Sequence, residues 1–148
     1  MEGPWWAELT TWVVVNIVNL SQAVGFLSRR RHGMAVNKVA GLVIAALAIP
    51  ATAALWAMAR VGNPWWIGPA TFDVFVVFML VVDYLRPIQW RHPRRLPIFI
   101  AYLLLFFGSI LLMGIPMYAL DRGLWLVTVG TTCALLIAMT VALRQGNG

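Results

Sequence analysis

The chain has 148 residues, of which 61% are hydrophobic and 11% charged, and its formal net charge is +6. A soluble domain carries about a quarter charged residues, so this composition excludes an ordinary soluble fold. It predicts an all-α polytopic membrane protein, since the length has room for four to six spans of roughly 20 residues each. The single cysteine, Cys133, excludes an internal disulfide and a paired-cysteine redox site.

Five apolar segments predict a bundle of five transmembrane helices in one domain that covers residues 1–148. The expected spans are roughly 9–28, 37–60, 67–86, 97–119 and 123–143. The N-terminus lacks the basic stretch of a signal peptide, so we expect the first span to remain in the mature chain. Pro50 is expected to kink the second span, and Asp121 to Gly123 to form a tight turn before the fifth.

The first span carries polar side chains in its middle. Asn16, Asn19 and Gln22 are spaced three apart, and Trp12 lies four residues before Asn16. This spacing places all four near one face of a helix. Polar side chains at membrane depth avoid lipid, so the face should point into a bundle or a cavity. We therefore expect the first span to be central.

The basic residues predict the orientation in the membrane. Nine of the eleven lie on the side of the first loop, the third loop and the C-terminus, and only Arg60 and Arg122 lie on the other side. The positive-inside rule then places the N-terminus outside and the C-terminus in the cytoplasm. This arrangement disfavours a nucleic-acid partner as the reason for the net charge. A second interpretation is that the loops bind anionic lipid headgroups or an acidic partner, through Arg30, Arg31, Arg91, Arg94 and Arg95.

Asp73 is the most unusual acidic residue, because it lies about 10 Å into the membrane from Trp66. Burying a carboxylate there costs about 2.5–3.5 kcal/mol on insertion scales, so the group requires a partner or a proton. Similar estimates place Asn16, Thr131 and Thr132 within about 10–15 Å of the same interface. One interpretation is a ligand-binding cluster, and the other is a satisfied buried network in which Arg60 reaches down to Asp73.

Seven of the eight tryptophans lie in the half that is predicted to face outside. An interfacial aromatic belt explains most of them. The alternative is an aromatic vestibule that binds a cationic or flat apolar ligand. Trp12 and Trp56 are the candidates for that vestibule, because both should lie below the interface.

Other chemistries lack their usual residue sets. His32 and His92 lie in basic loops, so the chain supplies no intramembrane imidazole for haem and a poor set for a metal site. Ser21 and Ser109 have no histidine at comparable depth, which disfavours a nucleophilic serine. We expect no cofactor and no metal.

Three functions follow, in order of preference. The first is a protein that binds or transports a small or lipid-like ligand in a polar, Trp-lined cavity of the outer half, alone or as a homo-oligomer. The second is a non-catalytic accessory subunit of a larger membrane complex, docked through the polar face of the first span. The third is a lipid- or isoprenoid-modifying enzyme with Asp73 or Asp83 as general acid or base. The predicted location is the cell membrane, as a multi-pass protein of a bacterial or archaeal inner membrane.

Overall fold

The computed structural model describes residues 4–33, 35–86, 88 and 95–145, and every regular element in these ranges is helical. In chain order the elements are α1 (Trp5–His32), α2 (Ala35–Arg60), η1 (Pro64–Trp66), α3 (Ile67–Leu80), η2 (Val81–Leu85), α4 (Leu96–Gly114), α5 (Met117–Leu120) and α6 (Arg122–Arg144). Within these ranges, five segments are long and apolar enough to cross a membrane, in agreement with the predicted number of spans. The chain is therefore a multi-pass membrane protein.

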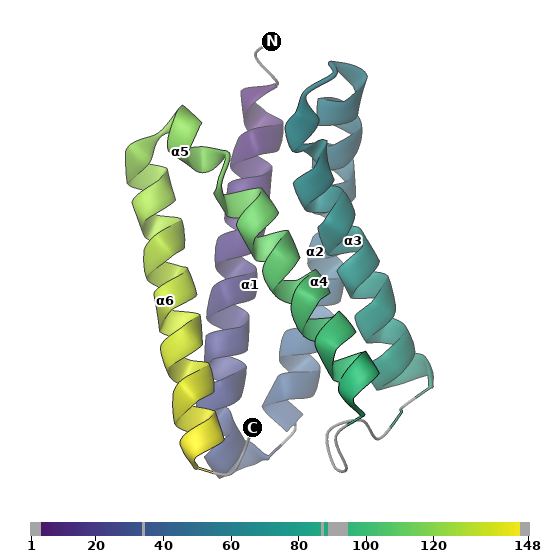
Figure 1. The fold of residues 1–148 in the computed structure, drawn as a ribbon, viewed down its shortest axis with the longest axis vertical. Helices are drawn as coiled ribbons and strands as arrows, with labels where there is room; N and C mark the ends of the chain where they lie inside the picture. The colour runs from purple at the N-terminus through teal and green to yellow at the C-terminus, as the bar shows by residue number, and fades with distance from the viewer. Residues whose placement is uncertain (1–3, 34, 87, 89–94, 146–148) are drawn as a thin grey trace.

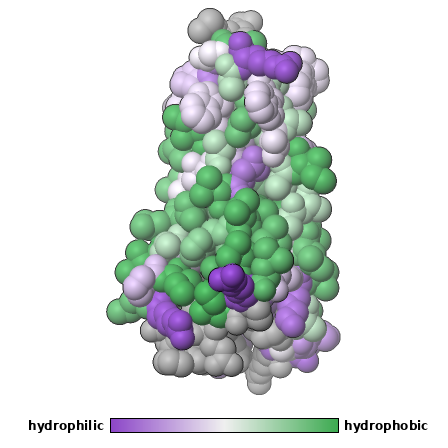
Figure 2. Space-filling view, turned by 90° about the vertical axis from the view of Figure 1, so that its right-hand side faces the viewer, coloured by the Kyte–Doolittle hydropathy of each residue, from purple (hydrophilic) through white to green (hydrophobic). Residues whose placement is uncertain are grey.

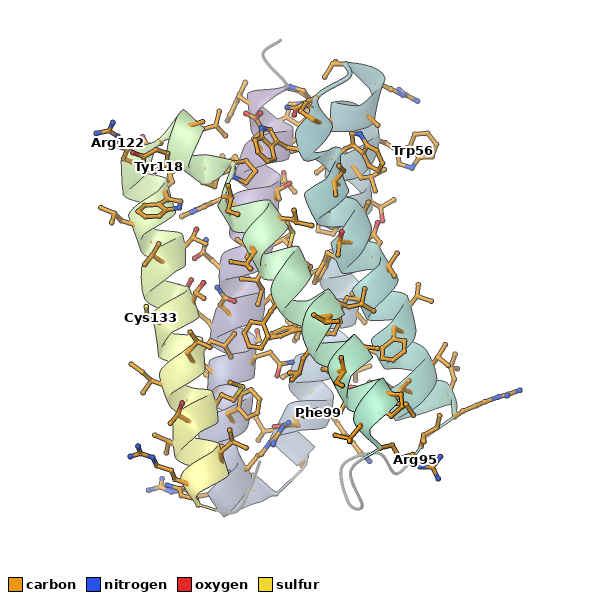
Figure 3. All side chains as sticks on the ribbon, viewed as in Figure 1. Trp56, Arg95, Phe99, Tyr118, Arg122 and Cys133 are labelled. Atoms are coloured by element: carbon orange, nitrogen blue, oxygen red, sulfur yellow. The ribbon has the colours of Figure 1, made fainter. Side chains whose placement is uncertain are left out.

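The helices form a single bundle (Figure 1). At the upper end of the bundle, as drawn there, α1 begins, α2 ends at Arg60 and α6 begins at Arg122. At the lower end, Arg95 precedes α4 and α6 ends at Arg144 (Figures 1 and 3). Figure 2 shows a broad apolar belt between hydrophilic residues at both ends. Large apolar side chains such as Ile49 and Leu104 are exposed over this belt, as expected of a surface that faces lipid.

Local signals explain most helix limits. Gly33 ends α1 with φ at 57°, a conformation that glycine adopts without steric cost. Asn63 caps η1 by accepting from the Trp65 backbone N–H at 3.0 Å. Asp121 caps α6 in the same way, by accepting from the Leu124 backbone N–H at 3.0 Å. The predicted tight turn from Asp121 to Gly123 is thus wrong, because Arg122 and Gly123 already belong to the first turn of α6.

A proline lies at the break between α4 and α5, whereas another lies inside an unbroken helix, α2. The fourth span ends its long helix at Gly114, and Pro116 precedes the short α5. By contrast, α2 continues through Pro50 as one helix.

α1 packs along both α2 and α6 and also contacts α4, which confirms the central place expected of it. α3 packs against α2 and α4, whereas α4 and α6 contact each other at only a few positions. α1 therefore separates the α2–α3 side of the bundle from α6.

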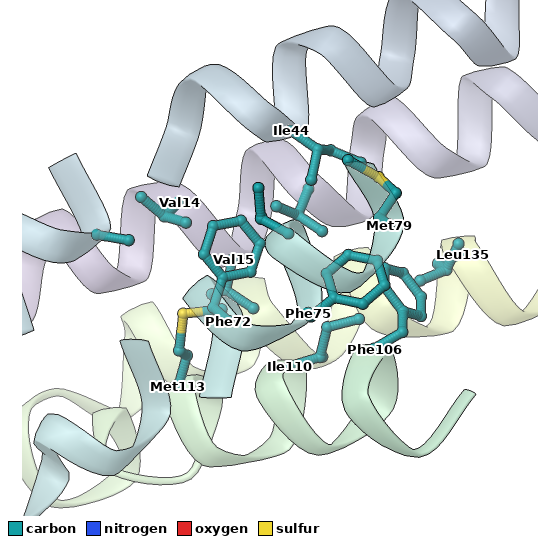
Figure 4. Packing of buried hydrophobic residues seen from close by; sticks show 13 residues of the cluster. Val14, Val15, Ile44, Phe72, Phe75, Met79, Phe106, Ile110, Met113 and Leu135 are labelled. Atoms are coloured by element: carbon teal, nitrogen blue, oxygen red, sulfur yellow. The ribbon is translucent and has the colours of Figure 1, made fainter. Parts of the chain in front are cut away.

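The apolar core lies where α1, α2, α3 and α4 meet. Figure 4 shows Phe72 and Phe75 of α3 inside it, with Val15 of α1 and Ile110 of α4 packed around them. The Phe75 ring lies 5.3 Å from that of Phe106, between ring centroids. A Cβ atom on Gly68 would lie 2.8 Å from the Leu112 carbonyl oxygen, so glycine is what allows α3 and α4 to approach this closely.

Candidate functional site

The polar face of α1 is hydrogen-bonded to α6 of the same chain. The Trp12 indole N–H donates to the Leu124 carbonyl at 2.9 Å. One turn further, the Asn16 side-chain amide donates to the Trp12 carbonyl at 2.8 Å and to Thr128 Oγ1 at 3.2 Å. Its carbonyl oxygen accepts from Thr131 Oγ1 at 2.7 Å. Both amide protons and the oxygen of Asn16 are thereby satisfied.

Asn19 continues the contact by one more turn. It is fully buried, and its amide nitrogen donates to Thr131 Oγ1 at 3.1 Å and to Thr132 Oγ1 at 3.0 Å. Thr132 in turn donates to the Thr128 carbonyl at 2.8 Å. We call this contact the α1–α6 seam, made of Trp12, Asn16, Asn19, Leu124, Thr128, Thr131 and Thr132. The seam has contacts at three levels about one helical turn apart. Asn19 Oδ1 is its one polar side-chain atom that is buried without a hydrogen-bond partner in the described chain.

The structure brings five of the eight predicted ligand-binding residues into this seam, namely Trp12, Asn16, Asn19, Thr131 and Thr132. Gln22 lies one turn further along α1, partly exposed, and makes no hydrogen bond within the described residues. Trp56 is elsewhere: its side chain is 60% exposed on the far side of α2 and points away from the bundle (Figure 3).

Asp73 also lies away from the seam, between α3 and α2. Its Oδ2 atom accepts a hydrogen bond from Thr52 Oγ1 at 2.8 Å. Its Oδ1 atom is enclosed by protein and has no hydrogen-bond partner in the described parts of the chain. The expected neighbour Arg60 is instead exposed at the end of α2. The single cluster predicted from matching depths is therefore divided between two sides of α1.

Of the five arginines predicted to bind lipid headgroups, the structure describes the side chains of two, and both lie at the lower end of the bundle. Arg31 is exposed at the end of α1, and Arg95 is exposed just before α4 (Figure 3). Arg91, Arg94 and the side chain of Arg30 lie outside the described residues. No group of three potential metal-ligating side chains occurs among the residues that were described.

An open apolar groove of about 220 Å³ lies between α4 and α6. We call it the α4–α6 groove; it is lined by Ile110, Leu111, Gly114, Ile115, Trp125, Thr128, Val129, Thr132 and Cys133. Thr128 belongs to both the seam and the groove. Its hydroxyl accepts from Asn16, while its methyl group lies 3.1 Å from where a Cβ atom on Gly114 would be. The wall of the groove is therefore largely hydrocarbon.

Aromatic and basic side chains stand near the upper end of this groove. The Tyr118 and Trp125 rings pack edge to face with centroids 5.3 Å apart. The Arg122 guanidinium lies 5.6 Å from the centre of the Tyr118 ring. Figure 3 shows Arg122 and Tyr118 at the upper end of the bundle and Cys133 further down α6.

Sequence reasoning missed the partners in three polar contacts. Thr128 is spaced three and four residues before Thr131 and Thr132, so helical periodicity could have placed it on their face. Thr52 is a lone threonine in an alanine-rich span and carries no such signal. Glu8 and Asn63 were not paired either; the Asn63 amide donates to buried Glu8 at 3.0 Å and joins α1 to the loop before η1.

No protein-family model, curated protein or solved structure matches this chain.

Proposed function

We propose that the protein binds a lipid-like ligand, with one hydrocarbon chain of that ligand in the α4–α6 groove. The observation that carries the proposal is the groove itself: two neighbouring helices diverge at membrane depth and leave an open, apolar space with a tryptophan in its wall. Pockets for drug-sized molecules enclose roughly 300–1,000 Å³. The smaller groove suits a length of chain better than a compact molecule.

The lining favours recognition by shape. The hydroxyl groups of Thr128 and Thr132 already take part in hydrogen bonds of the α1–α6 seam, so they offer little to a ligand. Membrane lipid tails are as apolar as the groove, so selectivity must come from van der Waals packing. At the polar end of the ligand, Arg122 with the Tyr118 and Trp125 rings favours an anionic headgroup.

The polar face of α1 supports this function indirectly. The side-chain amide nitrogens of Asn16 and Asn19 are paired with α6, so these two residues hold the groove wall in place and offer little to a ligand. The same pairing uses most of the polar face on which the accessory-subunit hypothesis relied and leaves only Gln22 of that face without a hydrogen bond within the described residues. We therefore prefer ligand binding to that hypothesis, and both to an enzymatic role.

The charge distribution supports an orientation for this site. Most described basic residues lie at the lower end of the bundle, and Arg60 and Arg122 lie at the upper end. By the positive-inside rule the lower end is cytoplasmic and both the N-terminus and the mouth of the groove are outside. We propose the cell membrane as the location.

Photo-crosslinking tests the proposal. The full chain in liposomes is mixed with an anionic lipid that carries a photoactivatable group on its acyl chain, and crosslinked peptides are identified by mass spectrometry. We expect crosslinks on Ile110–Ile115 of the α4 side and on Trp125–Cys133 of α6. Cys133→Trp should fill the groove and abolish these crosslinks.

Leu126→Trp is the matched control, because Leu126 is 61% exposed on α6 and does not line the groove. It should retain the wild-type pattern. Crosslinks spread evenly over all five spans, or unchanged by Cys133→Trp, would contradict the proposal.

A further inference from the structure

The Thr52–Asp73 pair lies within the membrane-spanning part of α2 and α3, away from the groove. Thr52 is in the middle of α2, and Asp73 lies about 10 Å along the third span from Trp66. The side that α2 and α3 form is mostly apolar in Figure 2, with one small hydrophilic area inside the apolar belt. The proposed ligand site does not use this pair.

The hydrogen bonds of Asp73 suit a carboxylic acid better than a carboxylate. An ionised carboxylate has only acceptor sites and can accept about four hydrogen bonds. Within the described parts of the chain, Asp73 has one hydrogen bond, to Thr52, and its Oδ1 atom is enclosed without a donor. A buried charge without pairing takes up or releases a proton instead of staying charged. The 2.8 Å separation between Asp73 Oδ2 and Thr52 Oγ1 is a normal O–H···O length in either direction.

Among the residues that the structure describes, no cation lies beside Asp73 to compensate the charge that its ionised form would carry. The described charged residues of α2 are Lys38 and Arg60, at its two ends. On the other neighbours of α3, Asp83 of η2 lies at the far end, α4 has Tyr102 as its one titratable side chain, and η1 has none. The hydrogen-bond partner of Asp73 in the described chain is the neutral Thr52.

We infer that Asp73 is a proton-binding site at membrane depth, in which the protonated carboxyl group and Thr52 share a hydrogen bond between α2 and α3. Its ligand is the hydrogen ion. In the protonated form Oδ2 donates to Thr52 Oγ1, and Oδ1 becomes a neutral carbonyl oxygen. Loss of the proton would leave an unpaired charge between two packed helices, so deprotonation requires α2 and α3 to separate or a cation to enter. Proton binding is thereby coupled to the packing of these helices.

A lipid-soluble carbodiimide tests this inference on the wild-type chain in liposomes. The acid proton moves to a nitrogen of dicyclohexylcarbodiimide, and the carboxyl oxygen bonds to its central carbon. Rearrangement to the N-acylurea retains every atom, so the modified peptide gains the mass of one reagent. We expect the reagent to modify Asp73 at neutral pH, and a water-soluble carbodiimide to leave Asp73 unmodified while modifying the exposed Asp121.

Modification should be lost in Asp73→Asn, which is close in shape to the neutral acid and should fold like the wild type. Infrared spectra give a second readout: the wild type should show a carboxylic acid C=O band that Asp73→Asn lacks. An unmodified Asp73 beside a modified Asp121, modification of Asp73 by the water-soluble reagent, or absence of the acid band would each overturn the inference.

Discussion

α6 meets α1 and α4 through two different kinds of contact. Along the α1–α6 seam, asparagine amides and threonine hydroxyls pair turn by turn, and the two helices pack over their length. Along the α4–α6 groove, the facing side chains are apolar and the helices diverge. The difference teaches that polar pairing is one way to close a helix contact in lipid, where apolar side chains gain nothing by leaving hydrocarbon.

α4 also has one closed side and one open side, but on its closed side a small residue takes the place of polar pairing. Against α3 it is closed, because Gly68 lets the two backbones approach. Against α6 it is open. A groove bounded by two closed contacts has walls that are held in place, which is what a binding site requires.

The largest loss of stability is expected when a side-chain atom is added where the backbones of α3 and α4 are in contact. Gly68→Ala puts a Cβ atom 2.8 Å from the Leu112 carbonyl oxygen, so the backbone of α3 or α4 must move. We expect a loss of roughly 1–3 kcal/mol in unfolding free energy, near the upper limit because the obstacle is backbone. Reversible unfolding in bicelles measures it.

Gly130→Ala is the control for this substitution, because nothing lies within 4 Å of the Cβ position at Gly130. It should be neutral or stabilise the helix by up to about 1 kcal/mol. Equal losses for the two variants would mean that the α3–α4 contact is not limited by Gly68.

The next largest loss of stability is expected when hydrogen bonds of the α1–α6 seam are removed. Asn16→Leu removes three hydrogen bonds, to Trp12, Thr128 and Thr131. Hydrogen bonds between side chains in membrane proteins contribute about 0.6 kcal/mol each on average, so we expect a loss of about 2 kcal/mol. The same unfolding measurement applies. A stability equal to the wild type would indicate that the seam is held by apolar packing alone.

A smaller and more specific effect is the coupling between the two helices. In a double-mutant cycle with Asn16→Ala and Thr131→Val, the interaction energy should be about 0.6 kcal/mol and at most about 1.7 kcal/mol. The cycle removes the 2.7 Å bond from Thr131 to Asn16 and cancels unrelated costs. Strictly additive losses would show that the two side chains do not interact across the seam.

The sequence predicted the spans and the polar face of α1 because both depend on periodicity and hydropathy within one helix. It did not predict which helix that face would meet. Depth estimates placed Asp73 and Thr131 at similar levels, but depth says nothing about direction around α1, and the two lie on different sides of it. The role of Thr52 could not be predicted from the sequence, because it depends on a hydrogen bond to Asp73 on a different helix. The groove depends on how far two helices diverge, which no local pattern records.

The most direct test of the central claim, that a lipid-like ligand occupies the α4–α6 groove, is native mass spectrometry of the chain extracted gently from its own membranes. We predict the 16.5 kDa chain, or a small multiple of it, with a retained lipid-like molecule. That molecule should be absent from Cys133→Trp and present in Leu126→Trp. A wild-type chain without any retained molecule, or equal retention in both variants, would contradict the account.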